Sequence, residues 1–401
     1  MEIQYSNNIS EVKPYAFAEV DKAVDNLRAQ GVEVVDFGVG DPSSPTADFV
    51  IDALGDASNQ RASSGYPSYI GDKNYRQVAA LYMERNFNVH LDAETEIIST
   101  IGSKEAIFHF PMGFVNQGDY VICPTPGYPP YQNGTRFAGG IPYFVPLLEE
   151  NDFLIDYEAI PEEICNKAKV IWINYPNSPT GKLASREWLE GLVQWAHNKD
   201  IIIAADEGCY IDIYTKEKPM SILEIAKEGI ITFYSLSKRN NMTGYRVGFC
   251  AGDERIISGF KKVKTNIDSG TPTFIQDAAS VALMDDEHVS TMRDEYSFKL
   301  TILTQTLQET GLPVCTSEST FYLWQKAPDG MSGIDLARAF LEAGIVTTPG
   351  EWISDEISDG SNPGTGYVRF AVVPSMETFM KGIEKIKQLN FNKVKADLLT
   401  A

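Results

Sequence analysis

Helical and strand periodicities divide the chain into segments. Apolar residues recur at spacings of three and four over 16–30 and again over 75–86. Such spacing predicts amphipathic helices, because residues three and four positions apart share one face of a helix. Residues 32–38 between them have the composition of a strand, and the Pro/Ser stretch at 41–46 interrupts any regular element.

A different rhythm begins at about residue 95. Short runs rich in β-branched and aromatic residues alternate with helical patterns such as 186–197. Short buried strands separated by helices predict an α/β fold with a mostly parallel sheet covered on both faces. The predicted strands are 119–123, 141–145, 169–174, 200–205, 230–234 and 247–251.

The last third of the chain has another order of elements. Residues 280–310 are strongly helical, and 311–390 follow the order strand, helix, strand, strand, helix, which predicts a smaller α+β unit. The segment 354–366 is rich in Gly, Ser and Asp, and we expect a mobile loop there. A length of 401 residues also favours two structural domains over a single core.

Charge and composition argue against several classes of function. The formal net charge is −21, from 55 acidic and 34 basic residues, and such a surface repels nucleic acid and anionic membranes. The first residues lack a basic segment followed by an apolar stretch, and no apolar run is long enough to span a bilayer. We therefore expect a cytoplasmic protein that binds neither nucleic acid nor a membrane.

Cysteine and histidine spacing offers no metal site or disulfide framework. The five cysteines are widely spaced without a CxxC pair, and the four histidines lack an HxxxH or HExxH pairing. Neither a GxGxxG nor a GxxxxGK[ST] phosphate loop occurs. The sequence therefore predicts no bound metal, no dinucleotide-binding motif and no P-loop.

The segment 234–249, YSLSKRNNMTGYRVGF, carries the strongest chemical signal. Lys238 follows a predicted strand, Ser235 and Ser237 precede it, and Arg246 lies eight residues after it. Hydroxyl donors and a guanidinium suit a phosphate ester, and a lysine among them can form an imine with an aldehyde. A solvated surface lysine is the alternative interpretation of this segment alone.

Two further segments carry candidate anion-binding residues. Arg369 lies in the apolar run YVRFAVV, where a guanidinium is costly unless it has an anionic partner. That partner is either a bound carboxylate or a structural salt bridge. The Gly-Ser turn of TIGSKEA, with Ser103 and Lys104, opens a helical stretch and offers either a phosphate cradle or a plain helix cap.

The pattern SLSKxxxMTGxRxGF closely resembles the cofactor-lysine motif of the fold-type I, class I/II aminotransferases, and the resemblance covers essentially the whole chain. It implies a pyridoxal 5'-phosphate (PLP) enzyme in which Lys238 forms the Schiff base. It also implies a large PLP domain with a mixed, mostly parallel seven-stranded sheet, and a smaller α+β domain built from both ends of the chain. We expect an N-terminal arm and part of the small domain in 1–45, the large domain in 46–285 and the small domain in 286–401.

Other motifs recur in the family's order and imply further roles. Tyr128 in TPGYPPY matches the ring that stacks on the pyridine, and Arg369 matches the arginine that grips the substrate α-carboxylate. Asp206, at the end of an apolar strand, matches the carboxylate that pairs with the protonated pyridine nitrogen. A buried structural carboxylate is the alternative for Asp206. The phosphate would be held by Ser103, Lys104, Ser235, Ser237 and Arg246.

The chain departs from the family's pattern at two places. The family usually has Asn directly before Pro-Thr-Gly to bond the cofactor's phenolic oxygen, whereas NYPNSPTG has Ser178 there and Asn177 one residue earlier. We expect Asn177 to take this role. A tyrosine usually follows the family's Asp by three residues, where this chain has Cys209. We expect Tyr210 instead, with a loop that is one residue longer.

Residues near the N-terminus extend the resemblance to the substrate and to a partner subunit. Gly40 in GVGDP matches a glycine turn close to the substrate, and Tyr15 lies on the N-terminal arm, where related enzymes contact substrate. Tyr66 in GYPSYIG matches a tyrosine that reaches the PLP phosphate of the neighbouring subunit. The resemblance therefore implies a homodimer.

The implied reaction moves an amino group between an amino acid and a 2-oxo acid, with glutamate and 2-oxoglutarate as one pair. No arginine occurs over 265–292, which argues against the aspartate aminotransferase arrangement. The sequence of the whole chain is most similar to the LL-diaminopimelate aminotransferase group, which favours a role in lysine biosynthesis. An aspartate, alanine or aromatic aminotransferase, a PLP-dependent C–S β-lyase and a non-catalytic relative stay open.

Overall fold

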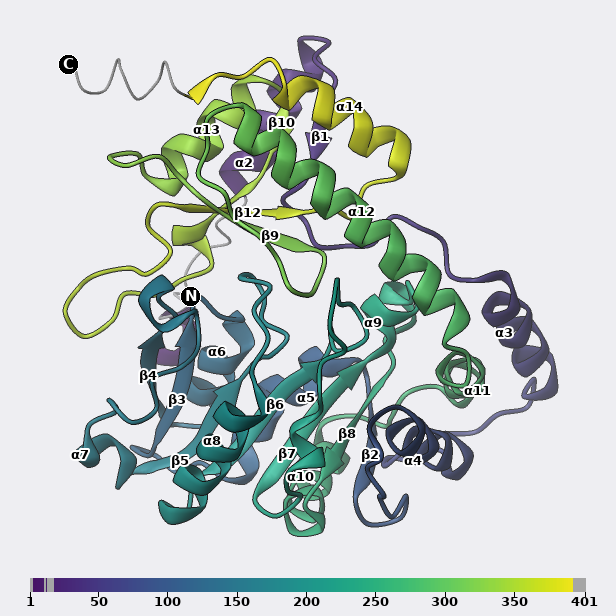
Figure 1. Cartoon of the computed structure of the whole chain (residues 1–401). Coiled ribbons are helices and arrows are strands. Elements are labelled where there is room, and N and C mark those ends of the chain that lie inside the picture. Colours follow the sequence, from purple (N-terminus) through teal and green to yellow (C-terminus); the bar gives the residue numbers. More distant parts are fainter. Residues whose placement is uncertain (1–2, 11, 13–17, 392–401) are drawn as a thin grey trace.

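The fold of the described residues, which are 3–10, 12 and 18–391 of a computed structural model, is built on one large and two small sheets (Figure 1). The large sheet has the strand order β2-β8-β7-β6-β5-β3-β4. β8 runs antiparallel to both of its neighbours, and all other pairs are parallel. The predicted mixed, mostly parallel seven-stranded sheet is thus confirmed. Its strands are β2 Ile97–Thr100, β3 Tyr120–Thr125, β4 Ile141–Pro146, β5 Ala168–Ile173, β6 Ile202–Gly208, β7 Ile230–Ser235 and β8 Gly248–Gly252.

Alternate residues of each strand face opposite helical layers. In β5, Val170 and Trp172 join the core under α5 and α10, whereas Ile171 and Ile173 join the core under α4, α8 and α11. Because both faces are covered, six of the strands are visible as apolar runs in the sequence. β2, with the sequence IIST, was not predicted, because it is short and ends in two hydroxyl residues. The helices around the sheet are α3 Asp48–Gln60, α4 Lys73–Phe87, α5 Ser103–His109, α6 Pro129–Phe137, α7 Glu162–Cys165, α8 Arg186–Asn198, α9 Leu236–Arg239, α10 Glu254–Ile267 and α11 Thr273–Leu283.

A smaller unit lies against one edge of this layer and combines segments from both ends of the chain (Figure 1). β1 pairs in parallel with β10, and β12 pairs antiparallel with both β9 and β11. Phe37 packs its ring against Phe370 and Phe379, which ties the N-terminal strand to the C-terminal core. The elements are β1 Val35–Asp36, α12 Glu287–Glu309, β9 Tyr322–Lys326, α13 Gly333–Glu342, β10 Ile345–Val346, β11 Thr348–Pro349, β12 Tyr367–Ala371 and α14 Met376–Ile386.

Two details differ from the elements predicted for the last third. The helical stretch predicted over 280–310 is two helices, because α11 ends at Leu283 and α12 begins at Glu287. Between α13 and α14 the structure has three strands where two were predicted, since β10 and β11 have only two residues each. A two-residue strand is too short to show a period. The exact domain boundaries stay a prediction.

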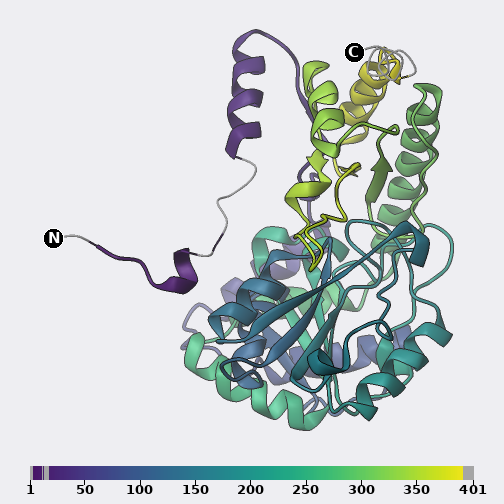
Figure 2. The same ribbon diagram turned by 90° about the vertical axis from the view of Figure 1, so that its left-hand side faces the viewer.

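The N-terminal segment stands away from the rest of the chain (Figure 2). It carries α1 Asn7–Ser10, which has no buried residue, and leads into α2 Ala18–Ala29. Within the described ranges, no helix combines the length and the apolarity needed to cross a bilayer.

Candidate active site

A cavity of about 720 Å³ opens at the carboxyl ends of four parallel strands, β3, β5, β6 and β7, and the small unit forms its far wall. Carboxyl ends of neighbouring parallel strands meet at one edge, so residues distant in sequence converge there. Most of the predicted site residues line this cavity. They are Gly40, Ser103, Lys104, Tyr128, Asp206, Tyr210, Ser235, Ser237, Lys238, Arg246 and Arg369.

Lys238 enters the cavity from α9, the single helical turn that follows β7. Ser235 caps this turn by accepting a hydrogen bond from the backbone N–H of Ser237. The side chain of Lys238 is half-buried, and its Nζ donates to the carbonyl of Gly40. A primary amine is thereby held at the centre of the cavity, where it can reach an aldehyde.

One end of the cavity is a cradle of hydrogen-bond donors. Gly102 has a φ of +71°, and a Cβ there would lie 2.4 Å from Nη2 of Arg246, so only glycine lets the guanidinium approach the start of α5. Arg246 Nη1 donates to the carbonyl of Thr243 at 2.6 Å. The hydroxyls of Ser103, Ser235 and Ser237 also line this end. A cation, three hydroxyls and a helix start suit a phosphate dianion.

Asp206 at the end of β6 is buried and only half satisfied. Its Oδ2 accepts from the hydroxyl of Tyr131 at 2.7 Å, whereas its Oδ1 is buried and has no hydrogen-bond partner among the described residues. Burial raises the pKa of this carboxyl to about 6. An orphaned buried oxygen calls for a donor, and the protonated ring nitrogen of PLP would supply both the donor and a positive charge. The residues present therefore fit PLP.

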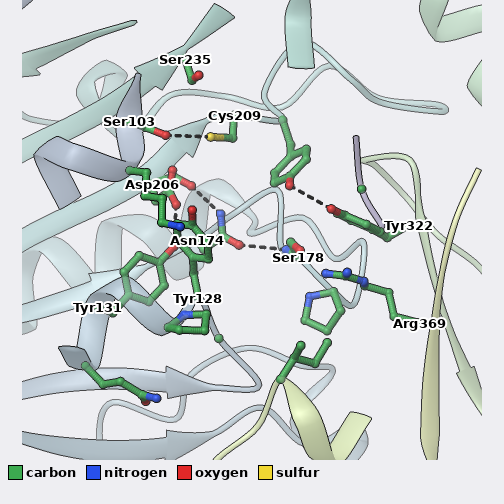
Figure 3. A pocket seen from close by; sticks show the side chains of 18 of the residues that line it. Ser103, Tyr128, Tyr131, Asn174, Ser178, Asp206, Cys209, Ser235, Tyr322 and Arg369 are labelled. Carbon is green, nitrogen blue, oxygen red and sulfur yellow. Dashed lines mark hydrogen bonds between the residues drawn. The ribbon is translucent and has the colours of Figure 1, made fainter. Parts of the chain in front are cut away.

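The two asparagines near the end of β5 have different surroundings. Asn174 lines the cavity; its Nδ2 donates to the backbone carbonyl of Asp206 at 2.5 Å, and its Oδ1 accepts from the N–H of Ser178 at 2.9 Å (Figure 3). Asn177 is buried outside the cavity lining. Its Oδ1 accepts from the Thr180 hydroxyl at 2.7 Å, and its Nδ2 donates to the Asn174 carbonyl at 3.0 Å. The structure thus brings Asn174 and Ser178 to the cavity, and uses the amide of Asn177 to hold a turn.

The extra residue before Tyr210 is absorbed inside β6. The pairing of β6 with β7 shifts between Ala205 and Gly208, so that Asp206 and Glu207 together lie opposite one residue of β7. This is a β-bulge, which inserts one residue and re-aims the side chains after it. Tyr210 consequently reaches the cavity, while the thiol of Cys209 lies 3.3 Å from the hydroxyl of Ser103.

Arg369 faces the cavity from β12 in the small unit (Figure 3). Its Nη2 donates to the carbonyl of Gly38 at 2.9 Å, and its guanidinium stacks on the ring of Tyr322 with 4.4 Å between Cζ and the ring centroid. Its Nε is buried and has no partner among the described residues. No ion pair of Arg369 occurs within the described ranges, so the guanidinium is placed to bind an anion that enters the cavity.

Part of the cavity lining is polar and carries both signs of charge. Gln132 and Asn133 lie four and three residues before Arg136 on α6, so all three can line the cavity from one side of that helix, and Asp355 lines it as well. A ligand longer than a simple amino acid would meet both a cation and a carboxylate here.

The described part of this chain does not bring two of the predicted residues to the cavity, and three residues that line the cavity were not predicted. Tyr66 is 89% exposed and does not line the cavity, and Tyr15 lies outside the described residues. Sequence reasoning overlooked Tyr131, Asn174 and Tyr322. Tyr131 could have been found, because it follows Tyr128 by one helical turn in the same motif. Tyr322 gave no such signal, since its place depends on how β9 pairs with β12.

Comparisons with known proteins agree with this geometry. The family profile described as "Aminotransferase class I and II" matches residues 32–386. The LL-diaminopimelate aminotransferase of Aquifex aeolicus is 44% identical over 391 residues, covering 96% of this chain and 99% of that protein. The LL-diaminopimelate aminotransferase of Nitratidesulfovibrio vulgaris is 40% identical, covering 97% and 100%. A solved Thermus thermophilus aspartate aminotransferase, a single mutant, has a TM-score of 0.88 at 27% identity and covers 96% of this chain and 100% of its own.

Proposed function

The chain belongs to the class I and II aminotransferase family and is a PLP-dependent aminotransferase, and on that premise we propose that its amino donor is LL-diaminopimelate and its acceptor 2-oxoglutarate. The reaction would serve lysine biosynthesis. The observation that carries the proposal is full-length identity of 40–44% to proteins named for that activity. The absence of arginine over 265–292 supports it against an aspartate aminotransferase.

The charged residues that line the cavity suit an amino donor that is charged at both ends. LL-diaminopimelate carries an ammonium and a carboxylate at its distal end as well as at its reacting end. Arg136 and Asp355 both line the cavity, so its lining includes both signs of charge for the distal end. Arg369 would bind the carboxylate next to the reacting carbon, as a guanidinium binds carboxylates in two-pronged fashion.

The residues around PLP would divide the work as follows. When bound, PLP supplies an aldehyde for the amino group and a ring that withdraws electrons. Asp206 would keep a proton on the ring nitrogen, and Tyr128 would pack against the ring face. Tyr210 would donate to the phenolic oxygen, and Lys238 would carry the proton that leaves the substrate Cα. The phosphate would be held by Ser103, Lys104, Ser235, Ser237 and Arg246.

A donor screen tests the proposal. The purified holoenzyme is given 2-oxoglutarate with LL-diaminopimelate, meso-diaminopimelate, aspartate, alanine or phenylalanine, and the glutamate formed is measured. We expect kcat/KM for LL-diaminopimelate to exceed that for aspartate, alanine and phenylalanine by at least about tenfold, because those donors lack an ammonium and a carboxylate at the distal end. meso-Diaminopimelate carries the same charges, so its rate shows whether the configuration of the distal carbon is also recognised. Faster turnover of another donor would reassign the substrate.

Two controls separate the remaining alternatives. Lys238→Ala should have no measurable turnover and no visible Schiff-base absorbance, and activity in that variant would remove the lysine from its proposed role. Release of pyruvate and ammonia from a cysteine conjugate without any 2-oxo acid would indicate a β-lyase instead.

A further inference from the structure

Tyr322 lies between the residue proposed to bind the substrate and a residue proposed to bind the cofactor. It is the first residue of β9 and is only 4% exposed, yet it lines the cavity. On one side the guanidinium of Arg369 stacks on its ring, and on the other its hydroxyl lies 3.3 Å from the hydroxyl of Tyr210 (Figure 3). One side chain of the small unit therefore contacts both groups.

The strands and the N-terminal segment fix the position of this ring. β12 pairs with β9 so that Arg369 lies opposite Trp324, which makes Tyr322 the diagonal neighbour of Arg369 on the same face of the sheet. A Cβ on Gly40 would lie 1.9 Å from the Tyr322 hydroxyl, so the hydroxyl packs directly on a glycine backbone. That same glycine accepts the hydrogen bond from Lys238. Tyr322 has no room to move toward Gly40, and it is held in contact with three residues of the site.

The number of protons on the two phenols determines which tyrosine donates the hydrogen bond between them. Each phenol has one proton to donate. If Tyr210 gives its proton to the phenolic oxygen of PLP, Tyr322 must be the donor in the bond between them. A hydroxyl that accepts one hydrogen bond also donates a stronger one, because the bonds polarise each other.

The ring of Tyr322 also restricts the orientation of the Arg369 guanidinium, whose Cζ lies 4.4 Å from the ring centroid. A guanidinium that is attracted to the face of an aromatic ring has fewer orientations open to it than one surrounded by solvent. Arg369 uses Nη2 on the carbonyl of Gly38, and its Nε has no partner among the described residues. The contact with the ring thus restricts how the guanidinium can present its remaining donors to a carboxylate.

We propose that Tyr322 is a positioning residue for this aminotransferase, whose ring orients Arg369 toward the substrate carboxylate and whose hydroxyl directs the proton of Tyr210 toward the cofactor. The inference rests on the roles proposed above for Arg369 and Tyr210. It goes beyond them by making one side chain of the small unit responsible for both.

Two substitutions separate the ring from the hydroxyl. Tyr322→Phe keeps the stacking surface and loses the donor, whereas Tyr322→Leu loses both. For each holoenzyme, the pH midpoint of the visible Schiff-base absorbance and the dissociation constant of succinate, an unreactive carboxylate, are measured by spectral titration. Neither readout requires turnover, and neither should respond to a general loss of stability.

The two variants should give different results. In Tyr322→Phe the midpoint should rise by roughly 0.3 to 1 pH unit, because a weaker bond from Tyr210 leaves more negative charge on the phenolic oxygen, which holds the imine proton. Succinate should bind that variant within about twofold of wild type, since the ring remains. In Tyr322→Leu the midpoint should rise likewise, and succinate should bind roughly 2- to 30-fold more weakly.

Control variants make each outcome decisive. Tyr75→Phe removes the hydroxyl of another fully buried tyrosine, which lies on α4, and it should change neither readout because Tyr75 does not line the cavity. If Tyr210→Phe leaves the midpoint unchanged, or Arg369→Leu binds succinate as wild type does, the proposed roles of those residues fail. If those variants respond while Tyr322→Phe keeps the wild-type midpoint, or Tyr322→Leu keeps the wild-type affinity, the inference about Tyr322 is wrong.

Discussion

Asn174 and Asn177 lie three positions apart in the sequence, yet only Asn174 lines the cavity, whereas Asn177 holds a turn. Both side chains are buried, but only Asn174 lines the cavity and bonds the backbone of Asp206. We expect Asn174→Ala to raise the dissociation constant of PLP, because it frees the strand end that carries Asp206. Asn177→Ala should instead lower the free energy of unfolding by about 1 to 3 kcal/mol, since it leaves Thr180 without its acceptor.

The measurement is a PLP titration of both apo-variants by absorbance, together with urea unfolding of each. A weaker PLP affinity in Asn177→Ala than in Asn174→Ala would favour the sequence-based prediction that Asn177 contacts the cofactor. The two positions could not be ranked from the sequence, because both precede Pro-Thr-Gly by a plausible distance. What separates them is the direction of each side chain in a turn, and no periodicity encodes it.

At the scale of one element, the bulge in β6 contains two consecutive buried carboxylates, Asp206 and Glu207. Burial raises the pKa of Asp206 to about 6 and that of Glu207 to about 7. Glu207 is satisfied within the chain, because the hydroxyls of Tyr234 and Ser221 both donate to it. Asp206 keeps one oxygen without a hydrogen-bond partner among the described residues, and a bound cation would stabilise its charged form.

This difference predicts how the stability of the apoprotein depends on pH. A carboxyl whose pKa is higher in the folded than in the unfolded chain stabilises the fold at low pH, and that contribution is lost as the pH rises through the folded value. For Asp206, the difference between about 6 and the ordinary 3.8 corresponds to a loss on the order of 3 kcal/mol once the pH exceeds both values. Most of this loss should fall between pH 4 and pH 7.

Thermal unfolding of the wild-type apoprotein and of apo-Asp206→Asn across that range checks the prediction. The wild type should lose more stability than the variant as the pH rises, and addition of PLP should remove the difference. Glu207 and the surface carboxylates titrate in both proteins, so the comparison cancels them. Equal losses in the two apoproteins would show that Asp206 does not titrate in this range.

The same strand shows where prediction of elements from sequence stops. The apolar run at 200–205 predicted β6, because burial on both faces leaves a continuous apolar signal. The bulge that follows carries no such signal, since it is defined by pairing with β7, a strand formed by residues more than 20 positions away. For the same reason the sequence identified Arg369 but not the neighbouring Tyr322, which depends on the register of β9 against β12.

At the scale of the whole molecule, the N-terminal segment has apolar groups that this chain does not cover. Ile3 and Tyr5 are 73% and 76% exposed, and the segment stands away from the rest of the chain (Figure 2). Tyr66, 89% exposed, lies outside the cavity of its own chain. Exposed apolar side chains on an extended segment favour contact with a second copy, and a symmetric dimer would apply that contact to both chains. We therefore expect a homodimer in which Tyr66 completes the partner's site.

Mixed dimers test this arrangement without any assumption about the substrate. Lys238→Ala subunits lack the amine, and Tyr66→Ala subunits would lack the residue given to the partner, so each homodimer should be impaired at both sites. When the two are unfolded and refolded together in equal amounts, half of the dimers are mixed, and each mixed dimer regains one intact site. Activity should rise to about a quarter of the wild-type value. Refolding Tyr66→Ala with the double variant Lys238→Ala/Tyr66→Ala should give no rise, because no subunit then supplies the tyrosine. No rise in the first mixture would place the function of Tyr66 within its own chain, and a rise in the control would show that refolding restores activity without Tyr66 from either chain.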